Sequence, residues 1–315
     1  MPLLQLIRWQ NLLIIFLTQF LVWVCVILPL GPEVLNPFNF YCITLSTILI
    51  AAAGYIINDY FDNKIDAINK PGKVVLGKTI PRKQAIIYHS LLNGIALLLA
   101  AYVAWRAGHF EWLLVQAGCT LLLWYYSTKF KRQLITGNIV VALLTALTVI
   151  TLIIYEPKLH YFLKGLVFET TGSGAYLLNP AWLLVFYSFF AFLLTWMREI
   201  VKDMEDIKGD SEQGCVTIPI KWGLSAAARF TQVLGLICVV SLLSSGVKLC
   251  YSDHALMGYY ILIIVTPLLV LWIITLNRKY TVEHYHSASR NLKIIMVLGL
   301  CSLIVSILSS HILSR

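Results

Sequence analysis

Two short segments of this chain gather acidic side chains that could bind metal ions. The first, NDYFDNKID at 58–66, follows an apolar run, YCITLSTILIAAAGYII, that holds no charged residue. The second, REIVKDMEDIKGD at 198–210, follows another apolar run. In both segments the three aspartates are separated by three and then four residues, and the tripeptide TIP occurs shortly afterwards, at 79–81 and 217–219. This similarity predicts a weak parallel internal repeat.

The spacing places each acidic set on one face of a helix. At about 100° per residue, the first set falls within an arc of about 100° and the second within about 60°. The sets are Asn58, Asp59, Asp62 and Asp66, and Glu199, Asp203, Asp206 and Asp210. Two acidic stripes at one depth would repel each other unless cations lay between them, and carboxylate and amide oxygens suit Mg²⁺. We therefore expect two Mg²⁺ ions between the segments.

Two other interpretations of the acidic segments remain open. A membrane helix can end in charged residues simply to stop at the lipid headgroups, although basic residues do this better than three acids on one face. A cation transporter would also need acidic side chains within its helices. Transporters, however, place such carboxylates near the middle of the bilayer, whereas both segments here follow the ends of apolar runs and lie among lysines.

The neighbouring lysines indicate what the metal ions would bind. Mg²⁺ with lysine and arginine forms a receptor for a diphosphate, and a diphosphate whose tail needs a membrane is most simply a prenyl diphosphate. The cations would stabilise the departing diphosphate as the allylic carbon–oxygen bond breaks. The resulting allylic cation needs aromatic surfaces and exclusion of water, and the chain holds 16 Tyr, 14 Phe and 9 Trp.

The rest of the sequence provides a membrane setting for these segments. Of the 315 residues, 59% are hydrophobic and 12% are charged, and the mean hydropathy is +0.80. Continuous apolar runs exclude a transmembrane barrel, so we predict an all-α polytopic membrane protein with nine transmembrane helices in one bundle, forming a single domain over 1–315. The nine apolar windows are 12–30, 41–57, 85–103, 112–126, 134–155, 180–196, 230–247, 255–276 and 294–312.

The distribution of basic residues predicts the orientation. Most of the 24 Lys and Arg residues lie near the N-terminus and in the connections after the second, fourth, sixth and eighth windows. This asymmetry places the N-terminus and both acidic segments on the cytoplasmic side of the cell inner membrane, with the C-terminus outside. His284 and His286 fall in the predicted loop after the eighth window and are interpreted as solvated. The net charge of +9 could attract anionic membrane lipids or anionic substrates, and nothing indicates nucleic-acid binding.

The two acidic segments resemble the aspartate motifs of the UbiA superfamily of intramembrane prenyltransferases. The resemblance extends over most of the chain, because nine helices with motifs after the second and the sixth fit the family. It implies that the leading Mg²⁺ ligands are Asn58, Asp62, Asp203 and Asp206, with Asp59, Asp66 and Asp210 in or beside the coordination shell. If the acceptor hydroxyl needs a base, Glu199 and Asp66 are the candidates.

Shorter matches to the family imply further site residues. Tyr125 and Lys129 in YYSTK match a Tyr-x-x-x-Lys motif at the end of helix four, which implies contact with the diphosphate or leaving group. RWQN, with Arg8 and Asn11, resembles the start of helix one and implies that Asn11 contacts substrate. Lys70 and Lys73 are implied to cap the diphosphate from the loop after helix two. Arg198 and Lys202 are further candidates for binding substrate, because two anionic headgroups close together need more positive charge than the metal ions provide. Family members often carry arginine at the positions of Lys70 and Lys73. An arginine side chain can donate two parallel hydrogen bonds to one phosphate group, which a lysine side chain cannot do.

Within the superfamily, the second segment most resembles the digeranylgeranylglyceryl phosphate synthase branch. This branch joins a geranylgeranyl group to a glycerol-phosphate ether lipid through oxygen. The alternative branch attaches a prenyl group to an aromatic acid such as 4-hydroxybenzoate in quinone biosynthesis. We favour the lipid acceptor, and we keep the aromatic acceptor and the cation transporter as alternatives.

Overall fold

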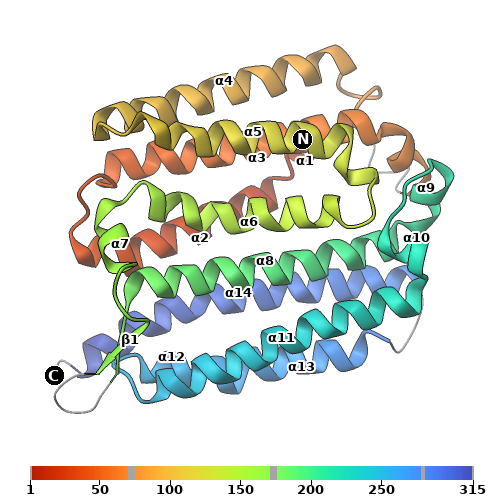
Figure 1. Ribbon diagram of the computed structural model, residues 1–315. Coiled ribbons are helices and arrows are strands. Elements are labelled where there is room, and N and C mark those ends of the chain that lie inside the picture. Colours follow the sequence, from red (N-terminus) through yellow and green to blue (C-terminus); the bar gives the residue numbers. More distant parts are fainter. Residues whose placement is uncertain (1, 70–74, 171–175, 278–280, 314–315) are drawn as a thin grey trace.

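The structure is a bundle of long helices that lie roughly side by side (Figure 1). It is a computed structural model that describes residues 2–69, 75–170, 176–277 and 281–313. The long helices are α2 (Trp9–Val22), α3 (Pro37–Asn69), α4 (Arg82–Ala107), α5 (Leu113–Thr128), α6 (Thr136–Ile154), α8 (Pro180–Glu205), α11 (Leu224–Cys250), α13 (Thr266–Thr275) and α14 (Val282–Leu313). The short helices are α1 (Pro2–Leu6), α7 (Pro157–Phe162), α9 (Ile207–Glu212), α10 (Ile218–Trp222) and α12 (Ala255–Tyr260).

The long helices coincide with the nine predicted apolar windows. In the described part of the chain, eight helical segments are long and apolar enough to cross a membrane. Two of them include a π-helical turn, at Trp23–Ile27 after α2 and at Ile261–Val265 between α12 and α13. The fourth window is α5, whose 16 residues span about 24 Å, less than a hydrocarbon core of about 30 Å. The all-α membrane fold is confirmed, and in the described residues eight helices are of spanning length while α5 is shorter.

The helices that carry the acidic segments extend well beyond their apolar runs. The window predicted to end at Ile57 continues as α3 to Asn69, because no glycine or proline interrupts residues 55–69, and Pro71 follows. The window predicted to end at Trp196 continues as α8 to Glu205. The first acidic segment is therefore part of a helix, as its spacing predicted. Both helices run in the same direction and end at the same end of the bundle, as the internal repeat requires (Figure 1).

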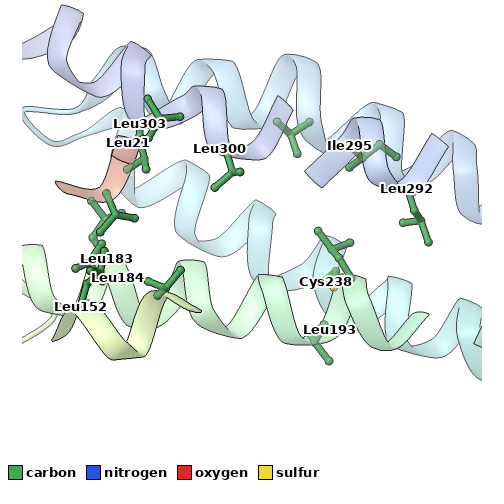
Figure 2. Close-up of a cluster of buried hydrophobic side chains, with 14 of the residues drawn as sticks. Leu21, Leu152, Leu183, Leu184, Leu193, Cys238, Leu292, Ile295, Leu300 and Leu303 are labelled. Carbon is green, nitrogen blue, oxygen red and sulfur yellow. The ribbon is translucent and has the colours of Figure 1, made fainter. Parts of the chain in front are cut away.

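The apolar core lies where α8 packs against α11 and α14. Figure 2 shows this cluster, which includes Leu184 and Leu193 of α8, Cys238 of α11, and Leu292 and Leu303 of α14. These five side chains are at most 5% exposed. In lipid, such close packing rather than the hydrophobic effect holds helices together, so it fixes the position of α14 relative to the acidic end of α8.

The end of the bundle opposite the acidic segments carries the remaining structure. It contains α7 and a hairpin of two three-residue strands, β1 (Phe168–Thr170) and β2 (Tyr176–Leu178), which are the only strands in the described residues (Figure 1). Glu156 is fully buried there and accepts backbone N–H groups of Glu33, Val34 and Leu35 at 3.0, 3.3 and 3.0 Å. The carboxylate thus satisfies the backbone between α2 and α3. α14 also ends on this side, as predicted for the C-terminus (Figure 1).

Candidate active site

A cavity of about 980 Å³ opens where α3 and α8 end. Its walls come from α1, α2, α3, α5, α6, α8 and α14. It is polar around the two acidic segments and along α14, and it has an apolar part formed by α3, α5 and α6. The predicted site residues that line it are Asn11, Asn58, Asp59, Asp62, Asp66, Arg198, Lys202, Asp203, Asp206 and Asp210. The structure therefore brings both acidic segments to one cavity. Lys70 and Lys73 lie outside the described residues.

The first acidic segment is paired with cations from two other parts of the chain. Asp62 is 4% exposed and forms an ion pair with Lys131, and its Oδ2 accepts the Nδ2–H of Asn58 at 2.7 Å. Asp59 accepts from Arg8 Nη2 at 2.6 Å. Arg8 has a φ of 51°, in the left-handed region, as the chain turns from α1 into α2. These cations compensate charges that burial would otherwise make very costly.

The second acidic segment occupies the end of α8 and the start of α9. Asp203 Oδ2 accepts from Asn138 Nδ2 of α6 at 2.9 Å. Asp206 ends α8, and Asp210 lies one turn into α9 with 4% exposure. The chain bends at Asp206, so the three aspartates do not share one straight helical face as their spacing predicted.

Asn69 links the two acidic segments directly. Its Nδ2 donates to the carbonyl oxygen of Asp206 at 3.0 Å, and its Oδ1 accepts from the N–H of Gly209 at 2.8 Å. A Cβ atom at Gly209 would lie 2.6 Å from this amide, so the contact requires glycine there. The last residue of α3 therefore fixes the position of α9, and with it Asp210, relative to the first segment.

The structure does not bring Tyr125 and Lys129 into the cavity. Tyr125 is 51% exposed and Lys129 is also exposed, and the neighbouring Tyr126 and Lys131 line the cavity instead. The physical reason is the end of α5: Tyr126 points about 100° away from Tyr125 around the helix axis, and a 3₁₀ turn at 130–132 follows Lys129. The contact of Tyr125 and Lys129 with the diphosphate therefore stays a prediction from the Tyr-x-x-x-Lys match, and Tyr126 and Lys131 are additional candidates because they line the cavity.

The turn that carries Lys131 is held tightly against the start of α6. A Cβ atom at Gly137 would lie 2.8 Å from the Phe130 carbonyl oxygen and 3.0 Å from the Lys131 Cα. The carbonyl oxygen of Arg132 accepts from Val216 N–H at 3.0 Å, which joins the turn to the connection after α9. Burial disfavours the charge of Lys131, but the carboxylate of Asp62 outweighs burial and raises its pKa. Lys131 is thus a fixed, protonated cation in the cavity.

Helix α14 contributes side chains that sequence reasoning missed. His284 and His286 lie in this helix rather than in a loop, and His286 Nδ1 is 3.0 Å from Glu205 Oε1. Arg290 and Lys293 line the cavity, and Lys293 donates to Asn11 Oδ1 at 2.7 Å. The helix begins at Val282, 12 residues before the ninth predicted window, so the sequence signal that could have found them is the helical spacing of 286, 290 and 293.

The donor set of the cavity fits Mg²⁺. The Oδ1 of Asn58 is buried and has no hydrogen-bond partner among the described residues, so an amide oxygen is left for a cation. No three acidic, His or Cys side chains of the described residues converge on one point. Mg²⁺ is commonly held by one or two carboxylates, waters and substrate phosphates, so this sparse arrangement suits Mg²⁺ better than a closed metal site. In this structure the ammonium of Lys131 and the guanidinium of Arg8 balance the first segment.

Comparison with known proteins decides the family. The profile of the UbiA prenyltransferase family matches residues 20–297. The chain belongs to this family. It is therefore a prenyltransferase and an integral membrane protein, which confirms the resemblance of the two acidic segments.

Relatives in the UbiA family cover nearly the whole chain. Digeranylgeranylglyceryl phosphate synthase of Methanosphaera stadtmanae is 28% identical over 305 residues, 96% of this chain and 97% of that protein. The synthase of Thermococcus sibiricus is 33% identical over 233 residues, 73% of this chain and 71% of that protein.

Solved structures of UbiA proteins share the fold. A structure of digeranylgeranylglyceryl phosphate synthase has a TM-score of 0.65 and 24% identity, covering 98% of both chains. A UbiA homologue from Archaeoglobus fulgidus bound to DMAPP and Mg²⁺ has a TM-score of 0.57 and 16% identity, covering 96% of this chain and 99% of that one.

Proposed function

We propose that this protein transfers a geranylgeranyl group from its diphosphate to the hydroxyl group of a lipid glycerol phosphate. The observation that carries the proposal is the single cavity in which two acidic segments, Lys131 and an apolar wall meet. An acidic cluster alone would suit a metal, and an apolar groove alone would suit a lipid. Their continuity suits an amphiphile with a diphosphate head and a hydrocarbon tail.

The chain's own residues would bind and orient the donor. Lys131 would donate to the diphosphate oxygens, and the positive charge would favour their departure as the allylic carbon–oxygen bond breaks. The apolar wall would take the prenyl tail, and it includes Ile50, Ala51, Leu123, Val141, Leu144 and Leu147. Tyr55, Tyr126 and Trp9 also line the cavity and would place aromatic surface near the allylic carbon.

Two bound Mg²⁺ ions would supply Lewis-acid stabilisation of the leaving diphosphate. The residues proposed to hold them are Asn58, Asp62, Asp203 and Asp206, with Asp59, Asp66 and Asp210 in or beside the shell. Support comes from the unpartnered Asn58 Oδ1 in this chain and from the Mg²⁺ bound in the A. fulgidus homologue. In the proposed reaction the acceptor oxygen forms a bond to the allylic carbon, and the bond from that carbon to the diphosphate breaks. The hydroxyl proton is released, and Asp66 and Glu199 are the nearby bases that could accept it.

The proposed orientation puts the cavity on the cytoplasmic side of the cell inner membrane, with the N-terminus, and leaves the C-terminus outside. Support comes from the excess of basic residues in the connections at the acidic end of the bundle. Both substrates would then present their polar heads to the cytoplasm and keep their tails in the bilayer.

The lipid acceptor is favoured over an aromatic one by the names of the relatives and by the cations on the wall of α14. We expect purified protein with Mg²⁺ and labelled geranylgeranyl diphosphate to prenylate geranylgeranylglyceryl phosphate and to leave 4-hydroxybenzoate unmodified. Mass spectrometry of the extracted products would distinguish the two. Turnover of 4-hydroxybenzoate without turnover of the lipid would replace the lipid acceptor by the aromatic one.

A further inference from the structure

The wall of the cavity formed by α8 and α14 carries more positive than negative charge. Its cationic side chains are Arg198, Lys202, Arg290 and Lys293, and its acidic side chains are Glu199, Asp203 and Glu205. Four cations against three carboxylates leave an excess of one positive charge, and Glu205 is also 3.0 Å from His286. The end of α3, by contrast, contributes three aspartates to the cavity.

The acids of this wall leave the guanidinium of Arg198 only partly paired. Lys202 Nζ contacts both oxygens of Glu199, at 3.0 and 2.9 Å, so Arg198 reaches the same carboxylate only at 3.3 Å. The Nε of Arg198 is buried without a hydrogen-bond partner among the described residues. Arg198 is also near enough to Lys202 and Lys293 to repel both.

The two cations of α14 have no acidic partner at all in the described residues. Among the residues that the structure describes, Lys293 donates only to the neutral amide oxygen of Asn11, at 2.7 Å, and Arg290 forms no ion pair. Helical spacing of three residues puts Arg290 and Lys293 on neighbouring turns of the same face. Lys293 is half-buried and Arg290 is exposed, and both line the cavity without a described counter-ion, which indicates an anionic ligand.

We propose that Arg198, Arg290 and Lys293 form a phosphate subsite that binds the headgroup of the acceptor lipid, separate from the diphosphate site at the two acidic segments. The proposal rests on the function proposed above. A phosphate monoester carries a charge of about −1.5 to −2, which the three cations of the subsite can balance. The bidentate guanidinium groups and the single ammonium group would together bind its oxygens.

The apolar surroundings of this subsite favour the acceptor over the donor as its ligand. Met296 lies one turn beyond Lys293 on α14 and lines both the main cavity and a second, apolar cavity of about 140 Å³. Ile14, Ile15 and Thr148 also line both cavities. A lipid held by its phosphate at Lys293 would therefore direct its tail towards Met296, away from the apolar wall at Leu123.

The test compares the lipid phosphate with the same lipid lacking its phosphate. In Lys293→Gln and, separately, Arg290→Gln, we expect the KM for geranylgeranylglyceryl phosphate to rise by about 10-fold or more, since a hydrogen bond to a charged group contributes about 1.5–3 kcal/mol. Turnover of geranylgeranylglycerol and the KM for the donor should stay unchanged. Competitive inhibition by glycerol phosphate should weaken in both variants. Lys221→Gln is the matched control, because Lys221 is exposed and lies outside the cavity.

Three results would overturn the subsite. The KM for the donor could rise instead, which would assign the cations to the diphosphate. The phosphorylated and dephosphorylated lipids could lose turnover equally, which would indicate a structural role. The KM for the phosphorylated lipid could remain unchanged while wild-type enzyme turns over both lipids, which would refute the subsite alone. Absence of any prenylated lipid with wild-type enzyme would refute the proposed function as well.

Discussion

Replacing either Asp62 or Asp206 by alanine is expected to abolish prenyl transfer while the protein still folds and inserts into membranes. Each change removes a proposed Mg²⁺ ligand from a different acidic segment. Mutation of a residue that only supports a metal ligand typically lowers activity by about 10–100-fold. We therefore expect mutation of a direct ligand to lower the rate by more than about 100-fold. The measurement is the initial rate of prenylated lipid formation at saturating Mg²⁺.

Two features of the structure keep this experiment interpretable. The carbonyl oxygen of Asp206, not its side chain, accepts from Asn69, so alanine preserves the link between the segments. Asp62 pairs with Lys131, and Asp62→Asn would keep the shape of the side chain while removing its charge. Glu212→Ala is the control, because Glu212 is an exposed acid of α9 outside the cavity. Near-normal rates in Asp62→Ala or Asp206→Ala would rule out the two-metal account.

Lys131→Met is expected to reduce the rate for every acceptor by about 10²–10³-fold, the usual cost of removing a group that stabilises developing negative charge. Lys131 lies in the turn between α5 and α6, lines the cavity and forms an ion pair with Asp62. In this position it would contact the leaving diphosphate. Lys129→Met should change the rate by no more than about 2-fold, as is usual for an exposed side chain. Rapid quench of single turnovers would place the loss in the bond-breaking step rather than in product release.

The comparison of these two lysines decides between the sequence motif and the geometry. Equal losses in Lys129→Met and Lys131→Met would show that both reach the diphosphate when substrates bind. A large loss in Lys129→Met alone would restore the site implied by the Tyr-x-x-x-Lys match. Both proteins should elute as wild type on size-exclusion chromatography, because Lys129 is exposed and Asp62 can be balanced by Mg²⁺ when Lys131 is absent.

The bundle and the convergence of the acidic segments were predictable from the sequence, because each depends on a strong local signal. Apolar windows of spanning length specify helices in lipid, and the matched spacing at 58–66 and 198–210 indicates two equivalent helix ends. The end of α3 was harder to predict. The acidic spacing predicted helix over 58–66, but the end at Asn69 depends on the absence of a helix breaker and on the partner that Asn69 has in α9.

The remaining site residues depend on contacts that no local pattern records. Lys131 faces the cavity only because Gly137 lets the 130–132 turn approach α6. Arg290 and Lys293 reach the cavity only because the apolar core fixes α14 beside α8, although the end of α8 at Glu205 and the start of α14 at Val282 are 77 residues apart in sequence. The predicted apolar window began at Ile294, so the polar first turns of α14 were assigned to a connection. Long-range packing, not composition, places these cations.

The most direct test of the central claim measures product formation in proteoliposomes as Mg²⁺ is removed and restored. With geranylgeranyl diphosphate and geranylgeranylglyceryl phosphate, we expect an ether-linked, prenylated lipid to form with Mg²⁺, to stop forming after EDTA is added, and to form again when excess Mg²⁺ is restored. A cation transporter would instead move ions without any prenyl donor. Undiminished product formation in EDTA, or ion flux with no prenylated product from any donor, would contradict the account.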